Sequence, residues 1–124
     1  MSTLKVNNIQ DTSGGDTTLV SATNTAKVWL VYDHFNDTLL NYYNVSSIDD
    51  NGTGLMTLNF STALPSANYA VAATGSREDN TTSAGHSVDT EVATYTTTQL
   101  ALRVHNLGST LKDCQRVGVV IYGD

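Results

Sequence analysis

The side chains that could carry out chemistry here begin with three histidines, His34, His86 and His105. Metal ligands within one chain usually recur at short spacing, so that one element presents them together. No two of these histidines are two or four residues apart. We therefore expect no metal site within one chain. The alternatives are solvated imidazoles at His86 and His105, or one histidine from each of three copies meeting on a symmetry axis.

A catalytic site has little support in the residue pattern. Ser, His and Asp all occur, but the Gly-X-Ser-X-Gly turn of many hydrolases is absent. Glycan cleavage requires two carboxylates about 5–10 Å apart in a cleft. The carboxylates fall mostly in turn-like segments, at Asp11, Asp16, Asp49, Asp50, Glu78 and Asp79. We predict no catalytic residue, no cofactor and no enzymatic activity.

The single cysteine, Cys114, lies between Lys112 and Arg116 in the sequence. Nearby cations favour a reactive thiolate. A cysteine near a turn or a strand start is more simply a small structural residue, and we favour that interpretation. One cysteine also excludes an intrachain disulfide, and no Cys/His spacing typical of zinc sites is present.

Residues 49–54 partly resemble a calcium-binding loop, because oxygen-bearing side chains alternate ahead of a glycine. The twelfth position of such a loop carries a bidentate Glu, and here that position is Phe60. A hairpin turn in which Asn-Gly supplies a positive φ explains the same residues. We favour the turn.

Composition limits the classes of partner. The 124 residues are enough for one domain with its own core. The net charge is −6 and the six Lys and Arg residues are scattered, so we expect no nucleic-acid binding. No apolar run approaches the roughly 20 residues that span a bilayer, and no charged-then-apolar leader is present. We therefore expect folding in a cytoplasm and no membrane insertion.

The elements that must position these residues are expected to be β-strands. Charged residues make up only 15% of the chain, and Thr, Ser and Asn are abundant, which favours strands and turns over amphipathic helices. Strand-like runs cover residues 17–21, 26–32, 39–47, 55–60, 68–74, 91–106 (one or two strands) and 116–122. Turns are expected at 48–54, at Pro65, and over 75–90 and 107–115. This spacing predicts an all-β, antiparallel β-sandwich with jelly-roll-like winding.

The run over residues 26–32 is apolar on both faces of the expected strand. Val28, Leu30 and Tyr32 point one way, and Trp29 and Val31 point the other. A strand of this kind is buried on both sides, either in the core of a sandwich or at a subunit interface.

Five segments resemble, in order, short tail-fibre and tail-associated proteins of tailed bacteriophages. They are MSTLKVNNIQDTSGG (1–15), AKVW (26–29), YNVSSIDDNGTG (43–54), ALPSANYAV (63–71) and the Val-rich end of the chain (117–124). The resemblance implies a β-sandwich that assembles as a homotrimer. It also implies a structural protein of the virion, made in the host cytoplasm.

The first part of the chain is expected to act in attachment. Residues 1–25 would form an extended attachment and trimerisation segment, and residues 26–124 the β-sandwich domain. Only Leu4, Val6 and Ile9 are large and apolar among the first fifteen residues. The sandwich can complete its core without them. We predict that they, with Trp29, contact other copies of the chain or other virion proteins.

Two segments depart from the resemblance and are expected to face the target, because loops on a rigid β scaffold often carry function. Residues 32–43 are rich in aromatics, and residues 75–90 form a long polar loop. The alternative to a binding role for this loop is a disordered excursion. The candidate receptor-contact residues are Arg77, Glu78, Asp79, Asn80, His86, Phe35 and Tyr43. Sugars stack on aromatic rings, which favours a host-surface glycan. The alternative is that the aromatics fill the core, at Tyr32 and Tyr42, or a subunit interface.

The expected function is that of a tail fibre or similar virion appendage whose distal loops contact a host-surface receptor. The alternative is a purely architectural decoration, collar or adaptor protein that binds other virion proteins and no receptor.

Overall fold

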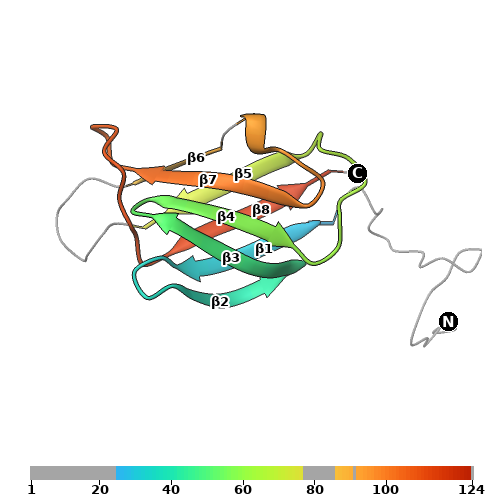
Figure 1. Cartoon of the computed structure of the whole chain (residues 1–124), viewed down its shortest axis with the longest axis horizontal. Coiled ribbons are helices and arrows are strands. Elements are labelled where there is room, and N and C mark those ends of the chain that lie inside the picture. Colours follow the sequence, from blue (N-terminus) through green and yellow to red (C-terminus); the bar gives the residue numbers. More distant parts are fainter. Residues whose placement is uncertain (1–24, 77–85, 91, 124) are drawn as a thin grey trace, which may run out of the picture.

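Eight β-strands form two sheets in the computed structural model, which describes residues 25–76, 86–90 and 92–123 (Figure 1). The strands are β1 (Val28–Asp33), β2 (Thr38–Tyr43), β3 (Val45–Gly52), β4 (Leu55–Phe60), β5 (Ala70–Gly75), β6 (Ser87–Thr90), β7 (Gln99–His105) and β8 (Val117–Tyr122). One sheet has the order β2-β1-β8-β5 and the other β3-β4-β7-β6, and all these pairings are antiparallel. The only helical segment within the described ranges is the short 3-10 helix η2 (Val92–Thr94). The expectation of an all-β, antiparallel fold is confirmed.

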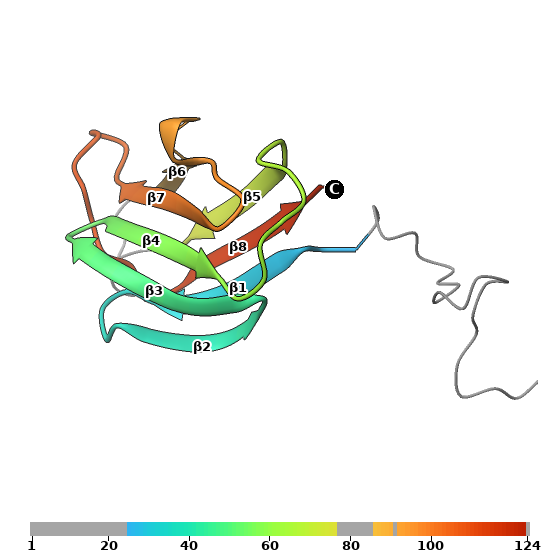
Figure 2. The same ribbon diagram turned by 45° about the vertical axis from the view of Figure 1, so that its right-hand side comes forward.

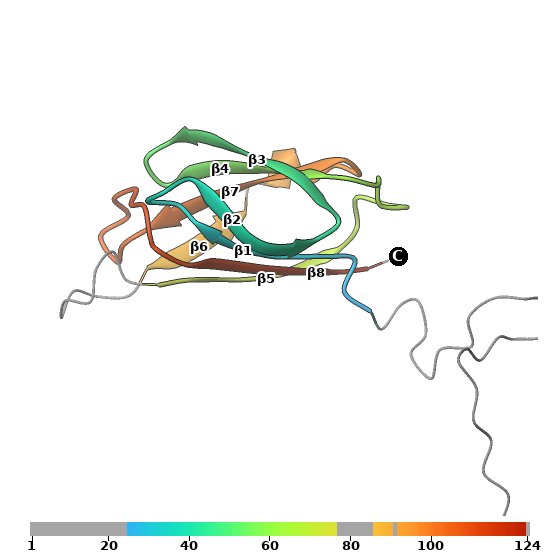
Figure 3. The same cartoon turned by 90° about the horizontal axis from the view of Figure 1, so that it is seen from below.

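The two sheets form two layers with the core between them, as Figure 3 shows. Side chains alternate along a strand, so every second residue of the central strands faces the other sheet. The most deeply buried of these are Val28, Leu30, Tyr32, Met56, Leu58, Leu100, Leu102, Val104, Val117, Val119 and Ile121. Each such side chain contributes about 1.5–3 kcal/mol by leaving water. The packing is sandwich-like, and the two faces expected for residues 28–32 are confirmed.

Jelly-roll winding stays a prediction. The first and last strands, β1 and β8, lie side by side, as they do in a jelly roll. The strand β2, however, pairs with β1 alone in these sheets, and β7 pairs with β4 and β6. The strand order does not confirm the jelly-roll part of the expectation.

The prediction of a single strand over residues 39–47 is wrong, because the chain passes from one sheet to the other at Asn44. Asn44 has a φ of +56°, a left-handed conformation that asparagine tolerates better than most residues. Its side-chain amide donates to the carbonyls of Lys27 and Thr62, and its side-chain oxygen accepts from the Thr62 amide. β2 therefore ends at Tyr43, and β3 continues through residues expected to form a turn.

The expected loop over residues 75–90 also needs correction. Ser87–Thr90 form strand β6, which pairs with β7, and His86 makes an isolated bridge to Gly75. The sequence of β6 is polar. It forms a strand because the edge of β7 that β4 does not use offers backbone hydrogen-bond partners. The segment 91–106 contains one strand, β7, preceded by η2. The expected strand at residues 17–21 lies outside the described residues.

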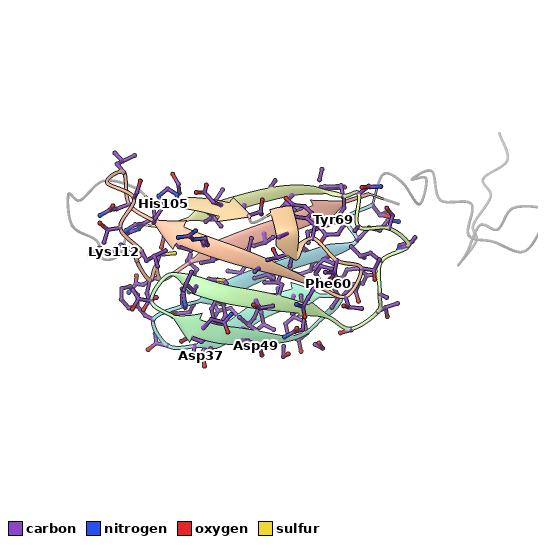
Figure 4. All side chains as sticks on the ribbon, turned by 45° about the horizontal axis from the view of Figure 1, so that its top comes forward. Asp37, Asp49, Phe60, Tyr69, His105 and Lys112 are labelled. Carbon is purple, nitrogen blue, oxygen red and sulfur yellow. The ribbon has the colours of Figure 1, made fainter. Side chains whose placement is uncertain are left out.

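The connections fall into two groups at opposite ends of the strands (Figures 1 and 2). The Thr25 end contains Thr25, the β2–β3 connection, residues 61–69 and residues 92–98. Here Phe60 packs edge-on against Tyr69 at 6.2 Å, and Tyr69 stacks on Tyr95 at 5.1 Å between ring centroids. The His34 end contains residues 34–37, the β3–β4 hairpin, Ser76, His86 and residues 106–116. In Figure 4, His105 and Lys112 lie at this end and Phe60 and Tyr69 at the other.

Candidate functional site

One outer surface of the sandwich is apolar across its whole width. On the sheet β2-β1-β8-β5, the register places Tyr43, Trp29, Val120 and Ala72 side by side, one from each strand. Their neighbours pointing the same way include Val31, Ala70 and Tyr122. These seven residues are called the Trp29 face below. The sequence predicted that Trp29 and Val31 point away from Leu30, and the register confirms it.

The central rows of the Trp29 face carry no charge. The other outward positions of the sheet are the uncharged Thr38, Asn41, Gly118 and Thr74, together with Asp33, the last residue of β1. Charged residues stand only at the strand ends, namely Lys27, Asp33 and Arg116. The Asp33 carboxylate accepts hydrogen bonds from the Asn36 side chain and from the backbone amides of Asn36 and Phe35. These bonds, led by the Asn36 side chain, lower the pKa of Asp33.

The opposite outer surface, on the sheet β3-β4-β7-β6, is polar. Its outward positions include Ser47, Asp49, Thr57, Asn59, Gln99, Arg103, His105, Ser87 and Asp89. Cross-strand hydrogen bonds connect several of them: the Asn59 side-chain amide donates to Asp49 at 3.0 Å and to Ser47 at 3.1 Å. The two outer surfaces of one small domain therefore differ sharply in chemistry.

Two hollows lie at the Thr25 end, with volumes of about 440 and 410 Å³, and Trp29 lines the smaller one. Both are lined by Lys27 and Tyr43. One continues over Trp29 to Thr25, and the other over residues 61–65. Asn44 lines the hollow over residues 61–65. Its side-chain amide group is already hydrogen-bonded to the backbone of Lys27 and Thr62. The hollows extend the Trp29 face toward the point where the described chain begins.

The two aromatic residues expected to contact a receptor do not lie together. Tyr43 ends β2 at the Thr25 end and is 55% exposed, whereas Phe35 lies in the turn at the His34 end and is 45% exposed. Tyr43 instead neighbours Trp29. Of the other aromatics in this stretch, Tyr32 is in the core, but Tyr42 is 52% exposed because β2 is an edge strand. The expectation of Tyr42 in the core is wrong.

The His34 end presents two exposed apolar tips on well-held turns. Phe35 follows Asp33, whose carboxylate accepts from the Phe35 and Asn36 amides. Leu107 is 79% exposed and follows Asn106, whose side-chain oxygen accepts from the amides of Gly108 and Thr110. Leu107 was not among the residues expected from the sequence. The signal available for it was a large apolar residue inside an otherwise polar turn.

The long polar loop is described only at its two ends. His86 is half-buried, and its Nδ1 lies 2.7 Å from the Ser76 carbonyl oxygen, to which it donates. The expectation of a merely solvated His86 is therefore wrong. Arg77, Glu78, Asp79 and Asn80 lie outside the described residues, as do Leu4, Val6 and Ile9 in the expected attachment segment. The strand ends that flank the loop, at Gly75 and Ser87, both reach the His34 end.

A buried histidine that the residue spacing did not single out lies between carboxylates at the His34 end. The His34 side chain is fully buried, with Nδ1 3.4 Å from Asp113 and Nε2 3.5 Å from Asp50. Neither ring nitrogen makes a hydrogen bond within the described residues. The two carboxylates face opposite edges of the ring, so they do not converge on one ion with it. Across the part of the chain that the structure describes, no three His, Cys, Asp or Glu side chains group so as to hold a metal.

Tyr32 belongs to the same cluster. Its ring centroid lies 5.6 Å from that of His34, and its hydroxyl donates to the Asp37 carboxylate. Burial raises the pKa of Tyr32 first of all, and the bond to Asp37 and the charges of Asp50 and Asp113 raise it further. The cluster ties the β1–β2 turn, the β3–β4 hairpin and the β7–β8 connection to one another.

Ser87, His105 and Asp89 lie close together on the polar surface, but they do not form a nucleophilic triad. Ser87 is the register partner of His105. Nε2 of His105 lies 2.5 Å from the Asp89 carboxylate, and Nδ1 lies 2.9 Å from the Asn106 carbonyl. Both partners are hydrogen-bond acceptors. Both bonds therefore raise the pKa of His105, the bond to the Asn106 carbonyl more than the bond to Asp89. Neither nitrogen is left to take a proton from Ser87.

The surroundings of Cys114 disfavour a reactive thiolate. Its side chain is buried in the core, and it donates to the Arg116 carbonyl at 3.4 Å. Burial raises the pKa of Cys114, the opposite of what an activated thiolate requires. The two cations that flank it in the sequence do not reverse this. The structural interpretation of Cys114 is the one that the geometry supports.

The hairpin interpretation of residues 49–54 is confirmed. Asp49 and Asp50 belong to β3, which pairs with β4, and Gly52 and Gly54 have positive φ values of +120° and +70°. The oxygen-bearing side chains have separate partners. Asp49 accepts from Asn59, and Asp50 accepts from the Gly52 amide.

Comparison with protein-family models, with curated proteins and with solved structures gives no match. Within the described ranges, no helix is both long and apolar enough to cross a membrane. The arrangement of surfaces on the sandwich therefore carries the functional argument.

Proposed function

We propose that this chain is a non-enzymatic structural protein of a tailed bacteriophage virion. It forms part of a tail fibre or similar appendage and assembles as a homotrimer. The Thr25 end faces the virion, and the connections at the His34 end contact a receptor on the host surface, for which a glycan is the favoured chemistry. Residues 1–25 make the attachment through Leu4, Val6 and Ile9.

The observation that carries the proposal is the separation of the two ends. The described chain enters at Thr25, and strand β1 runs from there to the opposite end. Strand β5 ends and strand β6 begins at that opposite end, which also carries the turn of Phe35. A domain held by its first residues at one end presents these connections outward. An appendage requires this separation between an attached end and an outward end.

The turns at the His34 end are suited to binding. The side chains of Asp33 and Asn106 hold the backbone of their turns, so Phe35 and Leu107 are presented in a fixed conformation. A binding surface that is already ordered loses less conformational entropy when a ligand arrives. An aromatic ring and neighbouring polar groups are the components that bind sugars by stacking and hydrogen bonding.

The chemistry of the polar groups supports a non-enzymatic role. Three of the four histidine and cysteine side chains are unavailable as a base or nucleophile: His105 donates to two acceptors, and Cys114 and His34 are buried. General bases need a nitrogen or an oxygen within reach of a substrate proton. None of these three side chains offers one.

The experiment has two arms. Mass spectrometry of purified particles of the phage that encodes this chain should detect it in the virion, and its absence would overturn the proposal. The purified protein should also compete with the phage for adsorption to host cells. The variant Phe35→Ala should compete at least several-fold less well. Gln99→Ala, at an exposed position at the Thr25 end, is the matched control and should compete like the wild type.

The architectural alternative makes a different prediction in the same experiment. A decoration, collar or adaptor protein would be found in the particle but would not compete for adsorption. It would also give no binding on an array of bacterial surface glycans. The apolar Trp29 face favours contacts with protein and is compatible with both functions, so the adsorption arm separates them.

A further inference from the structure

We propose that the Trp29 face is covered by further copies of this chain, which pack with their Trp29 faces toward one another. This inference deepens the self-association part of the proposed function by naming the surface that carries it. It rests on the chemistry of the sheet β2-β1-β8-β5 and not on the binding of any receptor.

The first argument is the extent of the exposed apolar surface. Tyr43 and Tyr122 are 55% and 45% exposed, and Ala70 and Ala72 are also exposed. Half-buried Trp29, Val31 and Val120 fill the space between them. Soluble monomers rarely expose a contiguous apolar patch of this kind. Aromatic enrichment and depletion of charge are features of the central part of protein–protein interfaces.

The second argument is charge, and it identifies a second copy as the occupant. The chain has a net charge of −6, so two copies repel unless they meet where carboxylates are absent. Asp49 and Asp89 lie on the opposite outer surface, and Asp50 and Asp113 at the His34 end. The Trp29 face has no charged residue between its strand ends. The central rows of two Trp29 faces can therefore meet without bringing like charges together, because Lys27, Asp33 and Arg116 stand at the strand ends.

The third argument is continuity around the edge of the sheet. The edge strand β2 also exposes Leu40 and Tyr42, at 44% and 52%. A flat pair of faces would leave that edge uncovered. A closed ring, in which every copy touches two neighbours, covers a face and the adjoining edge of each copy. We therefore expect a ring, and three copies of the 13.2 kDa chain would give a mass of about 40 kDa.

The test uses a matched pair of alanines on the two outer surfaces. Ala72 lies in β5 on the Trp29 face, and Ala101 lies in β7 on the polar surface. The variants Ala72→Lys and Ala101→Lys each change the net charge from −6 to −5, on opposite outer surfaces; Ala72 is exposed and Ala101 is half-buried. Light scattering coupled to size-exclusion chromatography should show an oligomer for the wild type and for Ala101→Lys. Ala72→Lys should need at least tenfold higher concentration to associate. Tyr43→Lys, at the other edge of the same row, should behave like Ala72→Lys.

Trp29 is the only tryptophan in the chain, so its fluorescence reports on this surface directly. On dilution of the wild type, its emission should shift to longer wavelength and become easier to quench by acrylamide. The shift should follow the loss of mass. Circular dichroism and thermal unfolding establish that each variant is folded, and Ala72 and Tyr43 are both exposed positions whose replacement leaves the core intact.

Three outcomes would overturn the inference. The wild type could remain at 13.2 kDa at every concentration. Alternatively, Ala72→Lys and Tyr43→Lys could both associate as tightly as the wild type. Finally, the Trp29 emission could stay unchanged while the oligomer dissociates, which would place the interface elsewhere. Failure here is distinguishable from failure of the proposed function, because the adsorption arm tests Phe35 at the opposite end.

Discussion

At the scale of single residues, the positions of the polar groups decide which chemistry is possible. His34 is enclosed between Asp50 and Asp113, and His105 donates to Asp89 and to a backbone carbonyl. These two histidines act as connectors between turns and strands. The partners of the two histidines come from different strands and loops, so no short sequence motif predicts these contacts.

His105 makes a prediction that NMR can check. The Asn106 carbonyl and the Asp89 carboxylate raise the pKa of His105 above its ordinary value of 6.5. The protonated form is therefore favoured in the folded state. The resulting stabilisation is fully present below the unfolded pKa and is lost as the pH rises through the folded pKa. An NMR titration should place the midpoint of His105 above 6.5.

The matched variants for this prediction are Asp89→Asn and Asp49→Asn. Asp89→Asn should lower the midpoint of His105, although the Asn106 carbonyl should keep part of the shift. Asp49→Asn alters a carboxylate on β3 of the same surface and should leave the midpoint unchanged. A wild-type midpoint at or below the ordinary value would contradict the prediction.

At the scale of elements, one turn glycine holds two connections together. Gly54 has a φ of +70°, its carbonyl accepts from the Val104 amide, and its amide donates to Asp113. A Cβ at this position would lie 2.5 Å from the Val104 carbonyl oxygen and 2.8 Å from the Lys112 amide. The backbone must come this close for the hairpin to pack on β7.

Gly54→Ala should therefore destabilise the protein by at least about 2 kcal/mol, through left-handed strain and the backbone clash. Urea unfolding monitored by circular dichroism measures the change. Gly108→Ala is the control, because Gly108 lies in a turn without a left-handed φ, and its nearest added contact is an Asn106 oxygen at 3.4 Å. Equal stability of the two variants would show that the close approach at Gly54 is unimportant.

At the scale of the whole molecule, the sandwich separates the surface that we propose for other copies from the end that we propose for a target. The described strands begin at Val28, and among the described residues the buried core between the two sheets runs from Val28 onward. The Trp29 face and the His34 end are carried by the same strands but do not share side chains. Assembly and recognition can therefore vary independently.

Removal of residues 1–15 should leave this sandwich folded, because the described residues already form a core between the two sheets. We expect the thermal unfolding midpoint to stay within a few degrees of that of the full chain. Incorporation into virions, measured by mass spectrometry of purified particles, should fall. A truncated protein that shows no cooperative unfolding would contradict the expected division between attachment segment and sandwich.

Much of the fold could be predicted from the sequence, because alternation is a local property. The alternation of Val28, Leu30 and Tyr32 with Trp29 and Val31 was predicted correctly. The boundaries were less predictable. Asn44 breaks one expected strand because its side chain finds partners at Lys27 and Thr62, and β6 forms from polar residues because β7 offers an open edge.

The sequence by itself determined that this chain is all-β, that Trp29 and Leu30 lie on opposite faces of one strand and that no cysteine pair joins its parts. The tertiary structure alone decided that Tyr43 lies beside Trp29 and far from Phe35, and that His34 lies between Asp50 and Asp113. The physical reason is that alternation along a strand depends on neighbouring residues. The grouping of side chains on a surface depends on which strands pair, and distant parts of the chain determine that pairing.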